Sequence, residues 1–293
     1  MKTFLLLGIF IVLQLLGFSQ VGINADGSSP DPSAILDAKS TTKGFLPPRM
    51  TNTQMMSVSN PTAGLLIYNT TLSSICWFNG TVWEIGKNRD GQSCGSVTYG
   101  GQIYNSVIIG MQCWMTTNLN IGTMITGWLN QTAGNGIEKY CYNDNLTNCA
   151  VYGGLYQWDE LMNYTTSSSS NPSGRQGICP AGWHVPGDAE WTQLTTYLGG
   201  ETIAGGPMKE TGTTHWISPN TGATNASGFT ALPGGYRNDG GGTDMLSFVA
   251  TFWSATESSS ADSWWRYLNY NDAQVFRDYD TKAIGFSARC SKD

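Results

Sequence analysis

Cysteine is the residue type in this chain most able to do covalent chemistry, and the sequence holds seven of them. In an exported protein, cysteines are oxidised, so three disulfides and one leftover thiol are expected. Two pairs bracket short segments, and the third would join the start of the last domain to its end. The expected pairs are Cys94 with Cys113, Cys141 with Cys149, and Cys179 with Cys290. Spacing alone leaves other pairings open.

The leftover residue is Cys76, which lies between Ile75 and Trp77 in an apolar stretch. We favour a buried free thiol here, and the alternative is a disulfide to another molecule. The cysteines also lack the paired spacing of zinc ligands, so no metal site and no cofactor are predicted.

The two histidines, His184 and His215, are the next candidates for chemistry, and no His-Glu-x-x-His motif is present. His184 lies in the segment GWHVP, just before a predicted helix. A structural hydrogen bond is favoured there over catalysis. His215 lies in a predicted loop, and its role stays open.

Paired carboxylates could serve a glycosidase, which needs two carboxyl groups facing one cleft. The pairs present are Asp159 with Glu160, Asp188 with Glu190, and Asp278 with Asp280. Nothing in the sequence sets any pair across a cleft. Asp188 and Glu190 fall in the first turn of a predicted helix, where capping and the helix dipole favour acidic residues. We therefore predict no catalytic residues and no enzyme activity.

The first 19 residues have the pattern of a signal peptide. An apolar run extends from Phe4 to Phe18, and Gly17 and Ser19 are small residues suited to cleavage before Gln20. The run is shorter than the roughly 20 residues of a membrane-spanning helix, although an uncleaved anchor is the competing interpretation. The prediction is a secreted or cell-surface protein with no membrane span.

Composition and charge narrow the class of protein and of partner. Charged residues make up 12% of the chain, whereas 36 glycines and 11 tryptophans are present. This balance favours short strands and many turns around an aromatic core. The formal net charge of −6 argues against nucleic acid or an anionic membrane as partner.

Two domains are predicted after the signal peptide, with a boundary near residue 88. Residues 20–88 contain GLLIYNTTLSSICWFNGTVWEIG, which predicts a small β-hairpin segment with its clearest turn at Asn79-Gly80. In residues 89–293, apolar alternation predicts strands at 97–109, and PGDAEWTQLTTYLGG predicts a helix. VYGGLYQWDELM (151–162) predicts a second helix, and Gly-rich loops broken by short strands are expected beyond residue 200.

The N-terminal region resembles known proteins in three segments, SAILDAKSTTKGFLPPRM, GLLIYN and FNGTVWE. It is similar to a segment of secreted proteins from Bacteroidetes-type bacteria and to pieces of phage tail-fibre proteins. The resemblance covers residues 21–86. It implies a stalk or attachment piece, with homo-oligomerisation through residues 20–88, and the alternative is a small β-subdomain without a partner.

A second resemblance covers residues 94–292. Its motifs are IGMQCWMTTNLN, YGGLYQWDE, CPAGWHVPGDAEWTQL, GGYR, WSATE and GFSARC. In this order they resemble the Fibrobacter succinogenes major paralogous domain. The resemblance implies an α+β, C-type lectin-like fold in the branch of formylglycine-generating enzyme, with two helices, small antiparallel sheets and long loops. A disulfide joining the domain ends is also typical of it, which agrees with the Cys179–Cys290 pair.

Two activities of proteins with that fold are not carried over. The reactive cysteines of formylglycine-generating enzyme have no match in this sequence. Calcium-dependent sugar binding would need clustered oxygen ligands, which residues 143–148, Glu257 and residues 269–272 could supply. The Glu-Pro-Asn, Gln-Pro-Asp and Trp-Asn-Asp triplets of calcium-binding lectins are absent, which argues against such a site.

The segment SADSWWRYLNYNDAQVFRDYDTKA, between WSATE and GFSARC, is dense in aromatic and small polar residues. Such residues bind through stacking and adaptable hydrogen bonds at low entropic cost. Some members of the family resemble targets of diversity-generating retroelements, which rewrite such segments. The candidate ligand-binding residues are Trp264, Tyr267, Asn269, Tyr270, Asn271, Asp272, Arg277, Asp278 and Tyr279. Strand alternation turns about half inward, and Trp265 and Leu268 are expected in the core.

The predicted function is that of a secreted or cell-surface adhesin or display protein. It would bind an unknown extracellular protein or glycan through the C-terminal face of a lectin-like domain, with or without retroelement diversification. One alternative is a structural surface or fibre component. A less favoured one is a carbohydrate-active enzyme that uses Glu257 and Asp278.

Overall fold

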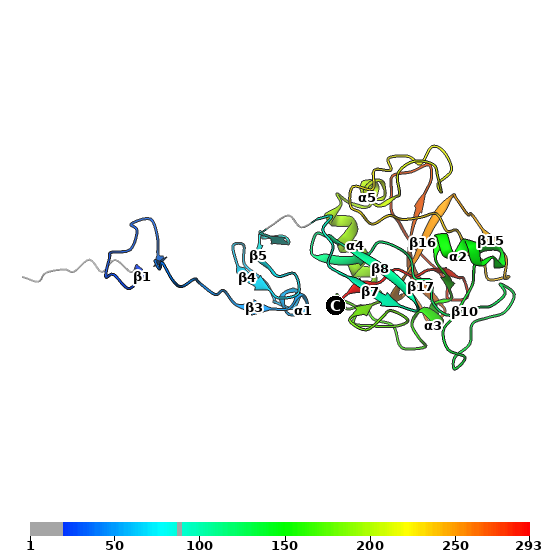
Figure 1. Ribbon diagram of the computed structural model, residues 1–293, viewed down its shortest axis with the longest axis horizontal. Helices are drawn as coiled ribbons and strands as arrows, with labels where there is room; N and C mark the ends of the chain where they lie inside the picture. Colours follow the sequence, from blue (N-terminus) through cyan, green and yellow to red (C-terminus); the bar gives the residue numbers. More distant parts are fainter. Residues whose placement is uncertain (1–19, 87–89) are drawn as a thin grey trace, which may run out of the picture. The chain divides into compact units, whose positions relative to one another are not determined.

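The computed structural model describes residues 20–86 and 90–293 (Figure 1). The predicted signal peptide, and residues 87–89 of the predicted linker, lie outside the described residues. The chain divides into two compact units, Met1–Pro47 and Pro48–Asp293. The predicted boundary near residue 88 therefore falls inside the second unit.

Residues 20–47, the described part of the first unit, bury very little surface. β1 (Val21–Ile23) and β2 (Leu36–Ala38) pair in parallel, and Pro47 is the single buried residue of this segment. A two-stranded sheet without a buried face is not stable by itself. The segment instead exposes six large apolar side chains: Val21, Ile23, Ile35, Leu36, Phe45 and Leu46.

The second unit begins with a small sheet of strand order β3-β4-β5-β6. Its strands are β3 (Arg49–Met50), β4 (Leu66–Asn69), β5 (Ser74–Phe78) and β6 (Trp83–Ile85). β4, β5 and β6 are antiparallel, which confirms the predicted hairpin strands. The predicted turn at Asn79-Gly80 is also present, because the Asn79 side chain accepts from the N–H groups of Thr81 and Val82, both at 2.8 Å.

A short helix, α1 (Asn52–Met56), packs on this sheet and was not predicted. It begins with a capping box, in which Thr51 and Gln54 each accept from the other's backbone N–H. Its Met55 joins Ile67 and Cys76 in a small core. Cys76 is fully buried and free, as favoured from the sequence. Burial raises the pKa of its thiol to about 11, so the reactive thiolate is scarce at neutral pH.

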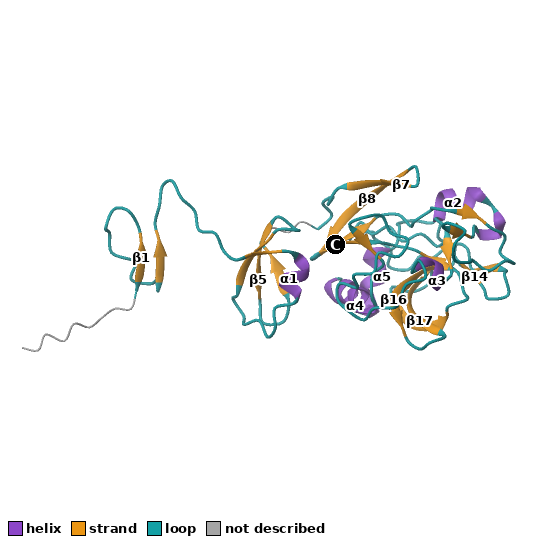
Figure 2. Ribbon diagram, turned by 90° about the horizontal axis from the view of Figure 1, so that it is seen from below, coloured by secondary structure: helices purple, strands orange, loops and turns teal. Residues whose placement is uncertain are grey.

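Residues 90–293, here called the head domain, contain two five-stranded sheets (Figures 1 and 2). The first has the order β13-β20-β9-β8-β7 and the second the order β12-β19-β16-β17-β18. Within the second sheet only β16 and β19 pair in parallel. The strands of the first sheet are β7 (Ser96–Tyr99), β8 (Gln102–Ile109), β9 (Gln112–Met115), β13 (Trp183–His184) and β20 (Ser291–Lys292). Those of the second are β12 (Leu155–Tyr156), β16 (Val249–Glu257), β17 (Asp262–Asn269), β18 (Phe276–Thr281) and β19 (Phe286–Ser287).

Two further strand pairs and several short helices complete the head domain. The pairs are β10 (Thr123–Met124) with β11 (Glu138–Lys139), and β14 (Tyr236–Arg237) with β15 (Thr243–Asp244). The helices are η1 (Tyr142–Asp144), α2 (Leu146–Tyr152), α3 (Trp158–Leu161), α4 (Asp188–Tyr197) and α5 (Glu201–Met208). The fold is thus α+β with mostly β structure. The expected count of two helices was wrong, since four α-helices are present in the described head domain.

The predicted helix over 186–200 is confirmed by α4, but that over 151–162 was wrong. α2 ends at Tyr152, and the following Gly153 has φ 87°, a left-handed value that favours glycine. The chain then runs as β12, where Leu155 and Tyr156 pair with β19, before α3 begins. Tertiary pairing of two residues overrides the helical pattern on either side of them.

α5 lies in a stretch expected to be a Gly-rich loop, so that prediction was wrong as well. Gly205 and Gly206 stand inside the helix, where glycine is unfavourable. A Cβ at Gly205 would lie 2.4 Å from the carbonyl oxygen of Gln274, and one at Gly206 would lie 2.6 Å from that of Gly222. The glycines are required by packing of neighbouring backbone, and not by a turn.

Aromatic side chains fill the core of the head domain. In one cluster, Trp191 packs on Trp114 at 4.7 Å between ring centroids and on Phe252 at 5.4 Å. α4 supplies Trp191 and packs on β16 and β17. A second cluster contains Trp158, Trp183 and Trp253. These two clusters fix the position of the β16–β17–β18 sheet on which the predicted binding residues lie.

Three disulfides join the six cysteines in the predicted pairs, Cys94–Cys113, Cys141–Cys149 and Cys179–Cys290. The last closes a loop of 111 residues. Beside it, β20 pairs with both β9 and β13, so the end of the head domain is hydrogen-bonded to its early strands. The domain is therefore closed both covalently and by its sheet.

Candidate functional site

The predicted binding segment forms the antiparallel pair β17–β18, and its register sorts the side chains onto two faces. Trp264 lies opposite Tyr279, and Arg266 lies opposite Arg277, so these four share one face. On the other face, Trp265 lies opposite Asp278, and Tyr267 lies opposite Phe276. The nine candidates therefore do not make one surface.

The first face carries a compact group that we call the Trp264 cluster, defined as Trp264, Arg277 and Tyr279. The Arg277 guanidinium lies 3.4 Å from the centroid of the Trp264 ring, a cation–π contact. The Tyr279 ring meets Trp264 edge-on at 5.4 Å between centroids. Tyr279 is 56% exposed, so the cluster is open to solvent.

Asp188, at the start of α4, fixes the cluster to the body of the domain. Its carboxylate accepts from Arg277 Nη2 at 2.9 Å and from Nε at 3.0 Å. It also accepts from Arg266 Nη1 at 2.7 Å, and that arginine is fully buried. Burial opposes ionisation of Asp188, but the hydrogen bonds and charges of Arg277 and Arg266 lower its pKa overall. The helix N-terminus favours the same charge.

The second face is a stack of aromatic rings. Trp265 lies 4.3 Å from Phe286 and 4.7 Å from Tyr267, and Tyr267 lies 4.7 Å from Phe276, all between centroids of stacked rings. Trp265 packs on the core, as expected. Because both faces of the Tyr267 ring are covered by neighbours, the predicted role of Tyr267 as a stacking contact lacks an open ring face.

The turn between β17 and β18 holds four more candidates, and a buried lysine organises it. Lys209 Nζ donates to the carbonyl oxygens of Asn269 at 2.9 Å, Asp272 at 2.6 Å and Thr221 at 2.9 Å. Burial lowers the pKa of Lys209 to about 8, so the ammonium still predominates at neutral pH. Tyr270 packs edge-on against Phe248 at 5.3 Å.

Of these four turn residues, only Asn271 is exposed, and Asn269, Tyr270 and Asp272 are partly buried. The Asp272 carboxylate accepts from the N–H of Gln274 at 2.8 Å and so caps the turn. The turn candidates thus contribute backbone and packing to the fold, and mainly Asn271 projects outward.

Asp278 lies on β18, the edge strand of its sheet. Its carboxylate accepts from the N–H of Tyr279 at 2.9 Å, and the Asp280 carboxylate accepts from that of Thr281 at 2.8 Å. Alternate N–H groups of an edge strand point away from its neighbour and are open to pairing with another chain. Asp278 and Asp280 therefore cap the edge with their own side chains.

Glu257, a further carboxylate considered from the sequence, accepts from Lys282 Nζ at 2.6 Å.

Both histidines hydrogen-bond to carboxylates. His184 is buried between Glu190 and Asp293, at 2.7 Å from each, which matches the structural role favoured from the sequence. Burial disfavours its charged form, but the bonds to Asp293 and Glu190 dominate and raise its pKa to about 9. Glu190 also accepts from Gly187 N at 2.9 Å, which is the predicted capping role. His215 contacts Glu210 at 2.8 Å.

Sequence reasoning missed the buried arginines. Arg237 of GGYR donates to the carbonyl oxygens of Gly127 and Ala283. Arg289 of GFSARC donates to those of Met115 and Phe229 and to the Asn118 side chain. The available signal was an arginine inside each apolar motif, because a buried arginine must find several acceptors. It also missed Trp128, which is 77% exposed.

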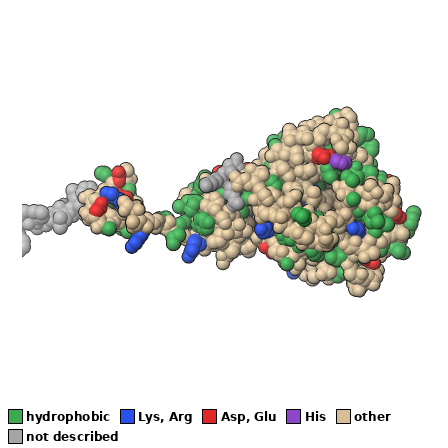
Figure 3. Space-filling model, viewed as in Figure 1, with side chains coloured by type: hydrophobic (Ala, Val, Ile, Leu, Met, Phe, Trp, Pro, Cys, Tyr) green, Lys and Arg blue, Asp and Glu red, His purple; other side chains and the backbone are tan. Residues whose placement is uncertain are grey.

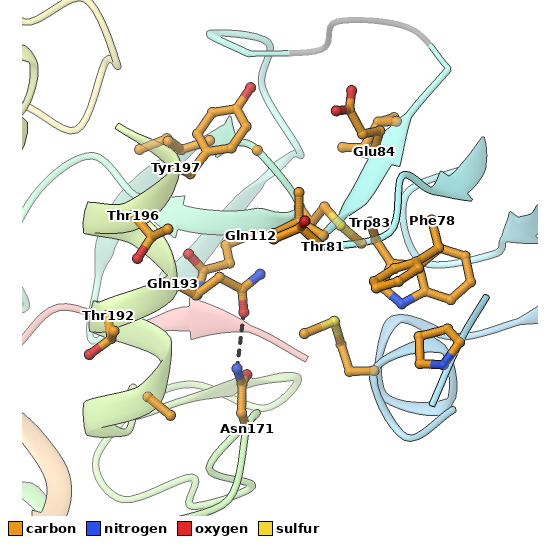
Figure 4. A pocket seen from close by; sticks show the side chains of 18 of the residues that line it. Phe78, Thr81, Trp83, Glu84, Gln112, Asn171, Thr192, Gln193, Thr196 and Tyr197 are labelled. Carbon is orange, nitrogen blue, oxygen red and sulfur yellow. Dashed lines mark hydrogen bonds between the residues drawn. The ribbon is translucent and has the colours of Figure 1, made fainter. Parts of the chain in front are cut away.

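A cavity of about 900 Å³ lies in the second unit and contains none of the nine candidates. Figure 4 shows Phe78 and Trp83 of the small sheet on one side and Thr192, Gln193 and Thr196 of α4 on the other. Gln193 accepts from Asn171 at 3.0 Å, shown as a dashed line. The lining combines apolar, amide and hydroxyl groups with two carboxyl groups, those of Glu84 and Asp90. The Asp90 carboxylate accepts from the N–H of Gly110 at 2.6 Å.

Two kinds of feature are absent from residues 20–86 and 90–293. No group of three or more His, Cys, Asp or Glu side chains in this part of the chain could hold a metal ion. Within the same residues, no helix combines the length and the apolar character needed to cross a bilayer.

Comparisons with known proteins find a matching family model for each of two parts of the chain. Residues 22–95 match a family model described as a phage tail like trimerisation region. Residues 107–292 match the model of the Fibrobacter succinogenes major domain. No curated protein and no solved structure matches the chain. Since the second model spans more than half of the sequence, the chain belongs to the Fibrobacter succinogenes major domain family.

Proposed function

We propose that this protein is a secreted or cell-surface binding protein that assembles as a homotrimer and binds its ligand at the Trp264 cluster. The observation that carries the proposal is the arrangement of Arg277. Its guanidinium is held between the Trp264 ring, at 3.4 Å, and the Asp188 carboxylate, at 2.9 Å, before any ligand arrives. Three disulfides support an extracellular location.

The cluster has the residue types and rigidity of a binding hot spot. Trp, Tyr and Arg are the side chains that most often dominate binding energy, and fixing them beforehand lowers the entropic cost of association. Tyr279 is the most exposed of the three and offers both a ring and a hydroxyl group. The ligand class is an extracellular protein or a glycan.

The fold we propose for the head domain is C-type lectin-like. Support comes from its two small sheets, its long loops and the Cys179–Cys290 bridge that ties its ends. The binding hairpin would then be presented by a scaffold whose loops carry recognition.

Trimer formation through the N-terminal region is supported by a physical argument as well as by the family model. Residues 20–47 expose Phe45 at 67% and Leu46 at 74%, and they have almost no core of their own. Apolar surface of this kind marks an interface between chains. The same feature supports the second candidate function, a fibre component, in which trimer formation is the main role.

A binding role is proposed here over a catalytic one. Glu257 is engaged by Lys282 at 2.6 Å, and Asp278 caps the strand edge. These two carboxylates therefore have structural partners in place of a shared cleft. Sustained hydrolysis of a polysaccharide that is lost on Glu257→Gln would contradict this part of the proposal.

The decisive experiment places the mature protein on an array of glycans and extracellular-matrix proteins and compares Tyr279→Ala with the unchanged chain. We expect the affinity for any ligand found to fall by at least about tenfold, because a hot-spot side chain is lost. The thermal midpoint should shift little, because Tyr279 is exposed.

The matched control is Tyr164→Ala, because Tyr164 is also exposed, at 42%, but lies outside the hairpin. That variant should bind like the unchanged protein. If both tyrosine variants retain full affinity, the Trp264 cluster is not the binding surface. Sedimentation equilibrium separately tests the trimer, and a monomer at micromolar concentration would contradict that part.

A further inference from the structure

Four large apolar side chains are exposed on loops of the head domain that lie outside the predicted binding segment. Trp128 is 77% exposed and Leu129 is 58% exposed, both between β10 and β11. Leu146, the first residue of α2, is 60% exposed, and Met245, just after β15, is 43% exposed. Figure 1 shows α2 and β15 at the same end of the head domain, and hydrophobic side chains reach the surface there in Figure 3.

Hydrogen bonds join the three loops into one surface. Thr243 donates its hydroxyl to the Asn143 side chain at 2.8 Å and accepts from the Asn143 N–H at 3.1 Å. The Gly127 N–H donates to the Asp144 carboxylate at 2.9 Å. Trp128 packs on Gly241, where an added Cβ would lie 2.9 Å from the tryptophan ring. We call this surface, defined as Trp128, Leu129, Leu146 and Met245, the tip surface.

Hydrogen bonds from buried side chains and a disulfide hold the backbone of the tip surface in place. Arg237, which is 1% exposed, donates from Nε and Nη2 to the Gly127 carbonyl oxygen at 2.9 and 2.7 Å. The Tyr140 hydroxyl donates to the Leu129 carbonyl oxygen at 2.8 Å, and the Cys141–Cys149 disulfide closes the adjoining loop. A fixed backbone that turns a tryptophan outward lowers the entropic cost of docking, as a preorganised interface does.

The chemistry of the surface and of its surroundings selects a partner. The three segments 125–131, 140–149 and 238–246 contain Asp144, Asp239 and Asp244 but no lysine or arginine. The exposed charge of these segments is therefore acidic, because the adjoining basic residues, Lys139 and Arg237, are buried. Anionic lipid would be repelled by it. Trp128 offers one ring face, but Leu129, Leu146 and Met245, which make up the rest of the surface, lack the ring faces and hydrogen-bonding groups with which proteins hold sugars.

We propose that the tip surface is a second docking site, separate from the Trp264 cluster, for a protein partner that presents an apolar recess rimmed by lysine or arginine. An apolar centre with an aromatic anchor and a charged rim is the common anatomy of protein–protein interfaces. Trp128 is the anchor that enters the recess. The three aspartates face the basic rim and speed association.

The test uses random dodecapeptides displayed on phage, selected on the disulfide-bonded protein with an excess of the double variant Trp128→Ser, Leu129→Ser as soluble competitor. The competitor removes peptides that bind elsewhere, including those that bind the Trp264 cluster. We expect the enriched peptides to combine an apolar residue with lysine or arginine. A synthetic peptide of the enriched sequence should then bind at least about tenfold more weakly to Trp128→Ser.

Two matched variants separate the apolar and the charged contributions. Ile203→Ser removes an apolar side chain of similar exposure, 53%, from α5 and should leave peptide affinity unchanged. Asp239→Asn should slow association and weaken its dependence on salt, with little change in dissociation. If Trp128→Ser alters the thermal midpoint, Leu146→Ser takes its place as the variant compared.

Three outcomes would overturn the proposal. The first is that no peptide survives the competition, or that the survivors bind Trp128→Ser as well as the unchanged protein. The second is that the enriched peptides carry no basic residue. The third is that Trp128→Ser changes the sedimentation of the protein alone, which would identify a second copy of the chain as the occupant.

Discussion

The two faces of the β17–β18 pair contain similar residues but have opposite roles. On one face, Trp264 holds Arg277 and Tyr279 at the surface, and on the other, Trp265 lies in an aromatic stack that ends in the core. Trp264 and Trp265 are adjacent in the sequence. In a segment rich in residues that commonly bind ligands, half of the side chains can thus serve the scaffold, and the strand register decides which half.

The largest predicted effect on stability comes from removing the scaffold tryptophan. Trp265→Ala should lower the free energy of unfolding by about 3–4 kcal/mol, because a large side chain packed between Tyr267 and Phe286 leaves a void. Urea denaturation measures the change. Trp128→Ala, at a site that is 77% exposed, is the control and should change it by less than about 0.5 kcal/mol. Equal effects of the two variants would show that the stack is not structural.

A smaller loss is expected when the lysine beneath the turn is replaced. Lys209→Met keeps most of the volume but leaves three carbonyl oxygens without their donor. We expect about 2–3 kcal/mol of destabilisation, since buried acceptors without partners are costly. Hydrogen exchange at residues 269–275 should accelerate more than exchange in α4. Uniform acceleration would mean that Lys209 supports the whole domain and not the turn.

Raising the pH should destabilise the face of the β17–β18 pair that carries Trp264 more than the face that carries Trp265. The pKa of His184 is raised from its ordinary value of 6.5 to about 9 in the folded state, so its protonation stabilises the fold fully below pH 6.5. That contribution, about 2 kcal/mol after allowance for the exposed Asp293 partner, is lost as the pH rises through 9. Because His184 holds Glu190 in the first turn of α4, the support for Asp188 weakens with it.

Thermal unfolding between pH 6 and pH 10 checks this dependence. The difference between the unchanged protein and His184→Gln should shrink steadily across that range. A constant difference would show that protonation of His184 does not contribute.

The smallest effect on stability is expected at Arg277, which is 36% exposed in its side chain. Arg277→Ala should cost about 0.5–1 kcal/mol, the usual range for a surface ion pair. Arg277→Lys keeps the charge but loses the planar stacking on Trp264. Binding should suffer in both variants if the cluster acts as proposed. A stability loss as large as that of Trp265→Ala would place Arg277 in the scaffold.

The covalent frame and the main helix could be predicted from the sequence because both depend on local or combinatorial rules. Seven cysteines in an exported chain predicted three disulfides, and the favoured pairs are the ones observed, although spacing alone left other pairings open. α4 followed from its apolar period and its closing glycines. β4, β5 and β6 of the small sheet followed from the apolar runs beside Asn79-Gly80, whereas β3 was not predicted. In each of these elements except the Cys179–Cys290 disulfide, which spans 111 residues, the signal and the structure it specifies lie close together in the chain.

The division of the candidate site could not be predicted, because it depends on contacts between distant segments. Alternation shows that half of β17 turns inward, but it does not show which half. Arg266 turns inward because Asp188, 78 residues earlier, supplies its counter-ion. Lys209 reaches Asn269 across 60 residues of sequence, and it does so through backbone atoms that carry no residue signature.

The hydrogen bonds from Lys209 to the turn affect which substitutions this protein can accumulate during evolution. The ammonium bonds main-chain oxygen atoms at Asn269 and Asp272, and the exposed Asn271 between them takes no part in these bonds. Most replacements of Asn271 would leave the loop in place while altering its outward chemistry. The turn is therefore a place where substitutions can create new binding specificities with little cost to the stability of the fold. This tolerance depends on Lys209, which must be retained.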